Sequence, residues 1–170
     1  MSKKFSLPLP VLLQSEHCVD RFDCGNEELN RYLKKFAYYN NQNRSSRTFV
    51  TFHKKEVVGY YTLTIGSVSR RETPQRVSKG LAKHPIPVFI LARLAVTKKY
   101  HRQSIGQSLL KNALLRILGV ADAIGGRAIL VHAKNDQVKK FYKSFGFESS
   151  PIDQFHLFLL LKDIKKTLGL

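Results

Sequence analysis

The chain contains one basic segment whose composition is typical of an anion-binding turn. It runs from Val96 to Ser108, includes two lysines, one arginine and one histidine, and joins an apolar run to a long amphipathic segment. If a helix begins there, the N–H groups of its first turn have no helical partners and attract an anion, helped by the helix dipole. The segment has neither the Walker A pattern nor that of a dinucleotide-binding turn. On these residues alone, an ordinary strand-to-helix loop is an equally good interpretation.

A tyrosine further along the chain has the chemistry of a proton donor. Tyr142 lies in the segment Asp136–Phe145, whose spacing predicts a short amphipathic helix. Phe141 and Phe145 are four residues apart and can both face the core, which would leave Tyr142 on a neighbouring face. A phenol hydroxyl can act as a general acid. Tyrosines on such helices are also common at the edge of a core, where they have no chemical role.

The charge of the chain indicates a negatively charged partner. Its 29 Lys and Arg outnumber 12 Asp and Glu, which gives a net charge of +17. The segment from Thr73 to Ala121 contains no acidic residue at all. Solubility does not require such an excess, so we expect a nucleic acid or another polyanion. The candidates for phosphate contacts are Arg31, Lys34, Lys35, Arg76, Lys79, Lys83 and Arg93. Taken singly, each is more readily explained as solvated surface.

Length and composition exclude several classes of protein. The 170 residues fit a single domain, 1–170, and 43% of them are hydrophobic, which argues against disorder. Two cysteines, Cys18 and Cys24, are too few for a disulfide scaffold and lack the spacing of zinc ligands, so we expect no metal. Pro8 and Pro10 interrupt the apolar N-terminus, and no apolar run reaches about 18 residues. We therefore expect no membrane association and a cytoplasmic location.

Hydrophobic periodicity predicts alternating strands and helices, and hence a mixed α/β sheet. The expected helices are Asn26–Asn43, Ile105–Ile124 and Asp136–Phe145, with a short helix after Pro74 in the polar connection Val68–His84. The expected strands are Phe5–Leu13, Thr48–His53, Val57–Ser67, Val88–Val96, Ala128–His132 and Gln154–Lys162, with one further strand, without assigned bounds, before the last. The residues Lys54-Lys55-Glu56 predict a hairpin.

Several motifs along the chain occur together in a pattern that resembles a known family. They are Ala92-Arg93-Leu94-Ala95-Val96, Ile105-Gly106 followed by Leu109-Leu110, Asn135, and Phe141-Tyr142 followed by Phe145-Gly146-Phe147. Together they resemble the GNAT superfamily of N-acetyltransferases. The N-terminal Phe22-Asp23-Cys24-Gly25-Asn26, followed by Leu29-Asn30 and Tyr32-Leu33, is similar to the GNAT toxins of toxin–antitoxin pairs. Those toxins acetylate the α-amine of aminoacyl-tRNA. The likeness extends from about Leu13 to Asp163.

The resemblance implies the GNAT acyl-CoA N-acyltransferase fold, a splayed central sheet flanked by helices. It implies acetyl-CoA as the cofactor, held between the central strand and the next parallel strand, and Tyr142 as the acid that protonates the departing thiolate. No metal is implied. The implied cofactor-binding residues are Leu94, Ala95 and Val96 for the acetyl and pantetheine groups, His101, Arg102, Gln103, Ser104, Ile105, Gly106, Gln107 and Ser108 for the pyrophosphate, and Asn135 and Phe141.

The pyrophosphate loop departs from the family motif, Gln/Arg-x-x-Gly-x-Gly/Ala. In the register set by Ile105 and the following leucines, the motif positions hold His101, Ser104 and Gly106. A register that begins at Gln103 misplaces the two leucines. Ser104 therefore stands where glycine would relax the turn. We expect weaker acetyl-CoA binding than is usual in the family, or a reshaped turn.

A general base is hard to identify in the sequence. No acidic residue lies near the central strand, and the remaining candidate is His132, although a histidine at a strand end is more often structural. The acceptor can explain this gap, because an α-amine has a pKa of about 7.7–8.0 whereas lysine has one of about 10.4. An α-amine is already partly neutral at pH 7. The missing base therefore favours an α-amine acceptor.

Three functions are compatible with the sequence. The first is a translation-blocking acetyltransferase acting on aminoacyl-tRNA; the resemblance implies a ribbon-helix-helix antitoxin whose C-terminal tail covers the toxin, and is compatible with a homodimer. The second is the same chemistry on a protein N-terminus, a lysine or a small amine, among which polyamines fit badly because a +17 protein repels cations. The third is a nucleic-acid-binding module whose altered loop has weakened or abolished catalysis.

Overall fold

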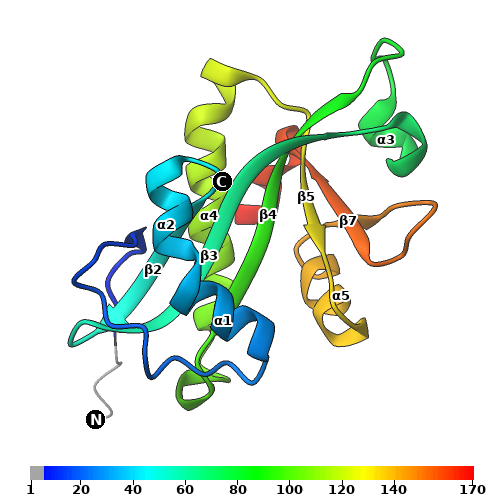
Figure 1. The fold of residues 1–170 in the computed structure, drawn as a ribbon. Coiled ribbons are helices and arrows are strands. Elements are labelled where there is room, and N and C mark those ends of the chain that lie inside the picture. Colours follow the sequence, from blue (N-terminus) through cyan, green and yellow to red (C-terminus); the bar gives the residue numbers. More distant parts are fainter. Residues whose placement is uncertain (1–5) are drawn as a thin grey trace. The chain divides into compact units, whose positions relative to one another are not determined.

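The strands of the protein form one mixed sheet, seen in a computed structural model that describes residues 6–170 (Figure 1). In that part of the chain the strand order is β1-β2-β3-β4-β5-β7-β6. The strands are β1 (Val11–Leu12), β2 (Arg47–His53), β3 (Glu56–Val68), β4 (Ile86–Val96), β5 (Ala128–His132), β6 (Glu148–Ser149) and β7 (His156–Leu160). Only β4 and β5 pair in parallel among the pairs β1–β2, β2–β3, β4–β5, β5–β7 and β6–β7. The expected mixed α/β sheet is confirmed.

Two of the helices begin at the residue predicted from the sequence. The helix α4 has the predicted bounds, and α5 begins at the predicted residue but ends two residues early. The helices are α1 (Glu27–Lys35), α2 (Ala37–Asn43), α3 (Gln75–Ser78), α4 (Ile105–Ile124), α5 (Asp136–Lys143) and α6 (Ile164–Leu168), with 3-10 turns η1 (Arg70–Glu72), η2 (Lys98–Tyr100) and η3 (Leu161–Asp163). No helix within residues 6–170 is long and apolar enough to cross a membrane.

The chain forms two compact units, and neither is continuous in sequence. The first extends up to Leu63 and also contains Arg93–Ala113, and the second contains Thr64–Ala92 and Leu114–Leu170. The strands β3 and β4 and the helix α4 each contribute residues to both units. The single domain expected from the length therefore stays a prediction.

The core of the first unit packs the helices α1 and α2 against β2, β3 and the end of β4. Tyr60 of β3 lies at its centre, edge-on to Phe22 at 5.5 Å, and its hydroxyl donates to the Leu29 carbonyl at 2.8 Å. The buried members of this core are Leu13, Phe22, Tyr32, Leu33, Ala37, Val50, Val57, Tyr60 and Ala95. Because Ala95 belongs to this core, the carboxyl end of β4 is fixed by the helices at the N-terminal part of the chain.

The single helix predicted over Asn26–Asn43 is wrong, because the chain breaks at Phe36. Asn26 caps α1 by accepting from the Leu29 N–H, as its position predicts. At Phe36 the backbone has φ −120°, which is not helical, and α2 begins one residue later. Phe36 is 42% exposed. The new direction of α2 buries Asn41 instead.

The first strand is also much shorter than predicted. Of the predicted strand Phe5–Leu13 only Val11 and Leu12 pair with β2, and Phe5 lies outside the described residues. Pro8 and Pro10 supply no N–H group to a sheet ladder. The Pro8 carbonyl accepts a hydrogen bond from the Thr51 hydroxyl at 2.8 Å, so the segment is held by a side chain instead.

The second unit has its own core, between α3 and the sheet. Its buried members are Val77, Ile86, Val88, Ala128, Leu130, Phe158 and Leu160. The short helix predicted after Pro74 is confirmed, and the Arg127 guanidinium holds it by donating to the carbonyls of Val77 and Lys79 at 2.8 and 3.2 Å. The last strand, predicted over Gln154–Lys162, is limited to five residues. The strand expected before it is the two-residue β6.

Asn41 gives a test of the first unit. Its side chain accepts from the Thr48 N–H at 2.7 Å and donates to the carbonyls of Leu13 and Thr48, each at 3.3 Å. Asn41→Ala removes the partner of the Thr48 N–H and one partner of each carbonyl, although the Thr48 carbonyl still accepts from the Leu13 N–H at 2.9 Å. We therefore expect a loss of about 2–4 kcal/mol of unfolding free energy in urea denaturation. The control Asn43→Ala changes an exposed residue on the same helix and should cost under about 1 kcal/mol. Equal effects of the two substitutions would contradict the anchoring role.

Candidate active site

The loop between β4 and α4 forms a strained turn at the start of a long helix. Two of its residues, Arg102 and Ser104, adopt left-handed conformations with φ of 62° and 60°. The Ser104 carbonyl accepts from both the N–H and the hydroxyl of Ser108, at 3.1 and 3.2 Å, and so begins the helical ladder. Glycine favours this conformation and other residues avoid it. The turn at Ser104 is therefore one that glycine would form at lower cost.

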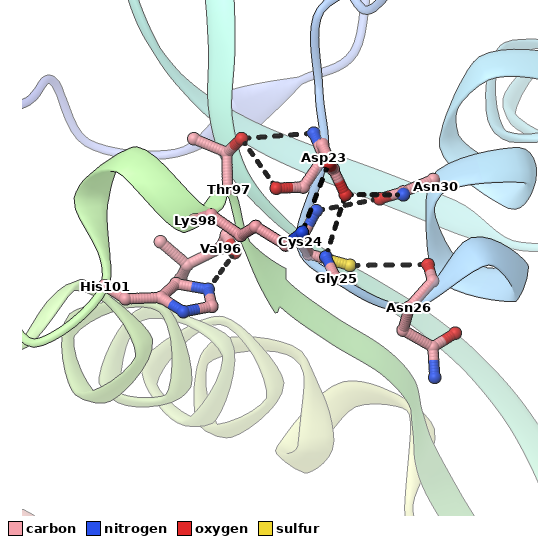
Figure 2. Close-up of polar contacts among 9 residues, drawn as sticks. All are labelled: Asp23, Cys24, Gly25, Asn26, Asn30, Val96, Thr97, Lys98 and His101. Carbon is pink, nitrogen blue, oxygen red and sulfur yellow. Dashed lines mark hydrogen bonds and ion pairs between the residues drawn. The ribbon is translucent and has the colours of Figure 1, made fainter.

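The His101 ring closes the loop on itself. Its Nε2 lies 2.6 Å from the Val96 carbonyl oxygen (Figure 2), and because a carbonyl only accepts, Nε2 carries the hydrogen. The ring nitrogen left for a ligand is Nδ1. A contact of His101 with pyrophosphate, as the resemblance implies, would therefore have to use Nδ1.

Asp23 ties the start of this loop to the segment before α1. Its backbone carbonyl accepts from the Lys98 N–H at 2.8 Å and from the Thr97 hydroxyl at 3.1 Å (Figure 2). Its carboxylate accepts from the Gly25 N–H at 2.9 Å and the Asn30 side chain at 3.1 Å, and lies 3.5 Å from the Lys98 ammonium. These hydrogen bonds, the one from Gly25 above all, lower the pKa of Asp23. The carboxylate is therefore charged at any physiological pH.

Gly25 makes this junction possible. Its φ is +87°, and a Cβ there would lie 3.0 Å from the Lys98 side chain. A larger residue would be strained in the backbone and would press on Lys98. The sequence interpretation used this segment only as a family signature and missed Asp23 and Thr97 as the residues that position the loop. The signal was present, since an aspartate and a glycine two residues apart are typical of an Asx turn.

The last residues of β4 extend beyond the stretch of this strand that pairs with β5. The pairs of β4 with β5 run from Val88↔Ala128 to Leu91↔Val131, and β4 continues to Val96. In this last stretch Ala95 is buried whereas Leu94 and Val96 are half-buried. The N–H of Thr97, just beyond it, donates to the Val58 carbonyl of β3 at 2.8 Å.

The second unit carries the remaining predicted site residues on α5. Asn135 is the N-cap of this helix, since its side chain accepts from the Val138 N–H at 2.9 Å. The expectation that Phe141 and Phe145 face the core and leave Tyr142 outside is wrong. Tyr142 is 5% exposed, and both phenylalanines are only half-buried.

Tyr142 is buried among aromatic rings. It lies edge-on to Phe141 at 5.2 Å and to Phe147 at 5.4 Å. The hairpin-like turn after α5 brings Phe147 back to the helix, which a helical periodicity could not reveal. Burial raises the pKa of the Tyr142 phenol, so the side chain keeps its proton throughout the physiological range.

The predicted cofactor residues thus fall into two groups, one in each unit. The first unit holds Leu94, Ala95, Val96 and the loop residues His101, Arg102, Gln103, Ser104, Ile105, Gly106, Gln107 and Ser108. The second holds Asn135, Phe141 and Tyr142. Within the described residues no three His, Cys, Asp or Glu side chains group as metal ligands, and neither Cys18 nor Cys24 forms a disulfide.

Basic residues on the first unit are interleaved with aromatic rings. The Arg93 guanidinium lies 3.5 Å above the Tyr32 ring, and Arg31 lies 5.5 Å above Phe36. The rings of Tyr32 and Phe36 are themselves stacked at 6.5 Å. Cation–aromatic stacks of this kind hold guanidinium groups in place. Beside them on α1, the predicted phosphate contacts Lys34 and Lys35 are exposed.

Arg76, in the second unit, has carboxylate partners that the sequence interpretation did not foresee. Its guanidinium donates to Glu148 and, at 2.9 Å, to Asp163. The hydrogen bond to Glu148, above all, raises the pKa of Arg76. Part of its charge is thereby neutralised, which makes it a weaker candidate for a phosphate contact than Lys79 and Lys83, both of which are exposed.

Comparison with known proteins agrees with this geometry. Residues 44–149 match the acetyltransferase (GNAT) domain, and the chain belongs to this family. It is 44% identical, over 89% of its length and 90% of the relative's, to the tRNA-acetylating toxin of Mycobacterium tuberculosis (strain ATCC 25618 / H37Rv).

Solved structures show the same likeness. AtaT complexed with acetyl-methionyl-tRNAfMet matches with a TM-score of 0.87 and 27% identity, over 96% of this chain and 99% of that one. A tyrosine-to-phenylalanine mutant of AtaT, bound to acetyl-CoA and the C-terminus of the antitoxin AtaR, matches with a TM-score of 0.81 and 27% identity, over 98% and 100%. The GNAT fold expected from the sequence is confirmed.

Ser104→Gly tests the strained turn. Glycine adopts a φ of 60° without the cost of about 1–2 kcal/mol that other residues bear, so the binding-competent turn should be more populated. We expect the Kd for acetyl-CoA, measured by calorimetry, to fall by about three- to tenfold. Lys54→Gly is the matched control, because Lys54 has a φ of 48° in the β2–β3 hairpin. It should change thermal stability and leave the Kd unaltered. An unchanged or higher Kd in the Ser104 variant would contradict the idea.

Proposed function

We propose that this protein is a toxin that transfers the acetyl group of acetyl-CoA to the α-amine of aminoacyl-tRNA and thereby blocks translation. The observation that carries the proposal is the 44% identity, over 89% of the chain, to a tRNA-acetylating toxin. The similarity to AtaT, solved with acetyl-methionyl-tRNAfMet, supports the same class of acceptor. A small amine as acceptor is disfavoured by the net charge of +17, which repels amines in their ammonium form.

The loop before α4 fits the pyrophosphate of the acetyl donor. Left-handed residues at Arg102 and Ser104 precede a 20-residue helix, whose first-turn N–H groups and dipole favour an anion at its N-terminus. A Cβ on Gly106 would meet only Leu94, at 3.9 Å, so the helix start is open to a ligand. Acetyl-CoA supplies an activated thioester. We assign its binding to the loop His101–Ser108, to Leu94, Ala95 and Val96, and to Asn135 and Phe141.

Tyr142 is the proposed general acid. Its buried phenol remains protonated at neutral pH, so the donor form is always present. It gives up its proton only as negative charge develops on the leaving sulfur. The rate should therefore not decline near pH 10, where an ordinary tyrosine ionises.

The basic surface of the first unit is the proposed site for the RNA. Arg31, Lys34, Lys35 and Arg93 would contact phosphates there, and Lys79 and Lys83 would do so on the second unit. Because each contact releases counterions, binding of tRNA should weaken steeply with salt. An acidic segment of an antitoxin would compete for the same charge.

The similarity to AtaT bound by the C-terminus of AtaR supports an antitoxin as the second partner. We propose a ribbon-helix-helix antitoxin whose C-terminal tail covers the toxin, and a cytoplasmic location for the toxin.

The proposed function is tested with labelled acetyl-CoA and bulk tRNA, charged and uncharged in parallel. We expect label to precipitate with RNA only when the tRNA is charged, because the acceptor is the α-amine of the amino acid. Label on uncharged tRNA would contradict an amino-acid acceptor. If neither tRNA sample is labelled although the protein binds acetyl-CoA, the acceptor is a protein or a small amine instead. Absence of both activity and binding would favour the nucleic-acid-binding module.

Tyr142→Phe tests the acid. The substitution removes one hydroxyl from a side chain that is 5% exposed, so packing and acetyl-CoA affinity should persist. Loss of a general acid should lower kcat by about 10²–10⁴-fold. Phe141→Leu, which removes the adjacent ring and leaves the hydroxyl, is the comparison variant and should lower kcat far less. A Tyr142 variant with the full wild-type rate would exclude this residue as the acid.

A further inference from the structure

Two histidines of the second unit stack on each other where β5 and β7 meet. His132, the last residue of β5, is the register partner of His156, the first residue of β7. Their rings are nearly parallel, at 11°, with centroids 4.0 Å apart. The two strands lie side by side in Figure 1. Antiparallel neighbours in such a pair face the same side of the sheet, so the two imidazoles form one unit.

A fixed carboxylate lies against this histidine pair. The Asp153 carboxylate is 3.4 Å from Nε2 of His156, and its other oxygen accepts from the Phe155 N–H at 2.9 Å. The carboxylate of Glu72, on η1, also acts electrostatically on His156, and its hydrogen bonds from Ser69 and the nearby Arg71 keep it ionised. The charged and titratable groups around the pair are thus Asp153, Glu72 and Arg71.

The histidine pair and the proposed acid lie on opposite faces of the sheet. His132 has the same parity on β5 as Ala128 and Leu130, which pack in the core beneath α3. Leu159 of β7 has the opposite parity and approaches Gly146, directly after α5, on the other face. The helix α5, with Asn135 and Tyr142, therefore covers the face that His132 does not occupy.

We propose that His132 is the general base that deprotonates the acceptor amine, with His156 and Asp153 as its positioning residues. This inference rests on the proposed function. The position fits the role, because β5 is the strand beside which the resemblance places acetyl-CoA, and His132 lies at its carboxyl end.

The α-ammonium gives one proton to His132, directly or through a water, and the neutral nitrogen forms a bond to the thioester carbonyl carbon. The C–S bond breaks, the sulfur takes the proton of Tyr142, and the phenol regains a proton from the second N–H of the attacking nitrogen. His132 then releases its proton to solvent. Burial and the neighbouring His156 lower the pKa of His132, although Asp153 opposes this, so the imidazole is neutral and able to accept at pH 7.

The first experiment measures kcat as a function of pH for the wild type and for His132→Gln, with saturating tRNA. The amino acid is joined to the tRNA by an amide instead of an ester, because the amide survives alkaline pH. The wild-type rate should be level above about pH 6.5, since a lowered pKa leaves His132 neutral there. The variant should instead follow the amine's own ionisation near pH 7.7–8.0. We expect a deficit of about tenfold or more at pH 6.5 and less than about threefold at pH 9.

His84→Gln is the matched control, since His84 is an exposed histidine of the same unit on the connection before β4. Its pH profile should match that of the wild type. Suppose that the wild-type enzyme acetylates charged tRNA, but the His132 variant has an unchanged pH profile or a loss of rate that does not depend on pH. This result would exclude His132 as the general base and leave the proposed function intact. A wild-type enzyme that acetylates no α-amine would overturn both.

The second experiment measures the pair without turnover. His156→Phe keeps an aromatic ring against His132 and removes the titratable neighbour and its contact with Asp153. The His132 imidazole, followed by NMR, should titrate at higher pH than in the wild type, toward its ordinary value of about 6.5. The rising limb of the rate profile should shift by the same amount. A His132 titration that does not move, or that moves without the rate limb, would contradict the coupling of the pair to catalysis.

Discussion

Asp23 is the residue on which the geometry of the first unit depends. Its carbonyl holds the backbone of the β4–α4 loop at Lys98, and its carboxylate holds the turn that leads into α1. A turn with two left-handed residues, Arg102 and Ser104, has an inherent cost, and such a turn persists where its surroundings determine it. At the start of the loop, Asp23, the Thr97 hydroxyl and the His101 ring hold the turn in place. At its end, the first hydrogen bonds of α4 do so. The loop proposed to bind the pyrophosphate is therefore held in part by Asp23 and Thr97, which are not among its proposed contacts with the anion.

Local sequence patterns predicted the exact bounds of two elements. The helix Ile105–Ile124 and the strand Ala128–His132 have the predicted bounds, because one has a sustained apolar face and the other is a continuous apolar run. The prediction of one helix through Phe36 was wrong because the direction of the chain after Phe36 is set by Asn41. The Asn41 side chain forms hydrogen bonds with the backbone of Thr48 in β2 and with the carbonyl of Leu13. Periodicity carries no information on such a polar contact between elements.

The same distinction applies to the site. The departure at Ser104 could be recognised from a motif, and its left-handed φ is the structural counterpart. The burial of Tyr142 could not, because Phe147, which covers it, follows the end of the helix. The carboxylate partners of Arg76 lie 72 and 87 residues away along the chain. A count of charges cannot tell a paired cation from one that is available to RNA.

The acceptor and the positive charge of the protein are connected. An enzyme with a net charge of +17 destabilises an ammonium near its surface and so favours the neutral, nucleophilic amine, but by the same field it repels a free cationic substrate. An amine attached to RNA resolves this conflict, because the phosphates supply the attraction and lie apart from the reacting nitrogen. The positive potential of the protein then favours loss of a proton from the ammonium, so a weak base can accept it. A single neutral imidazole is sufficient for an α-amine that is already partly deprotonated, whereas a lysine would demand a stronger one.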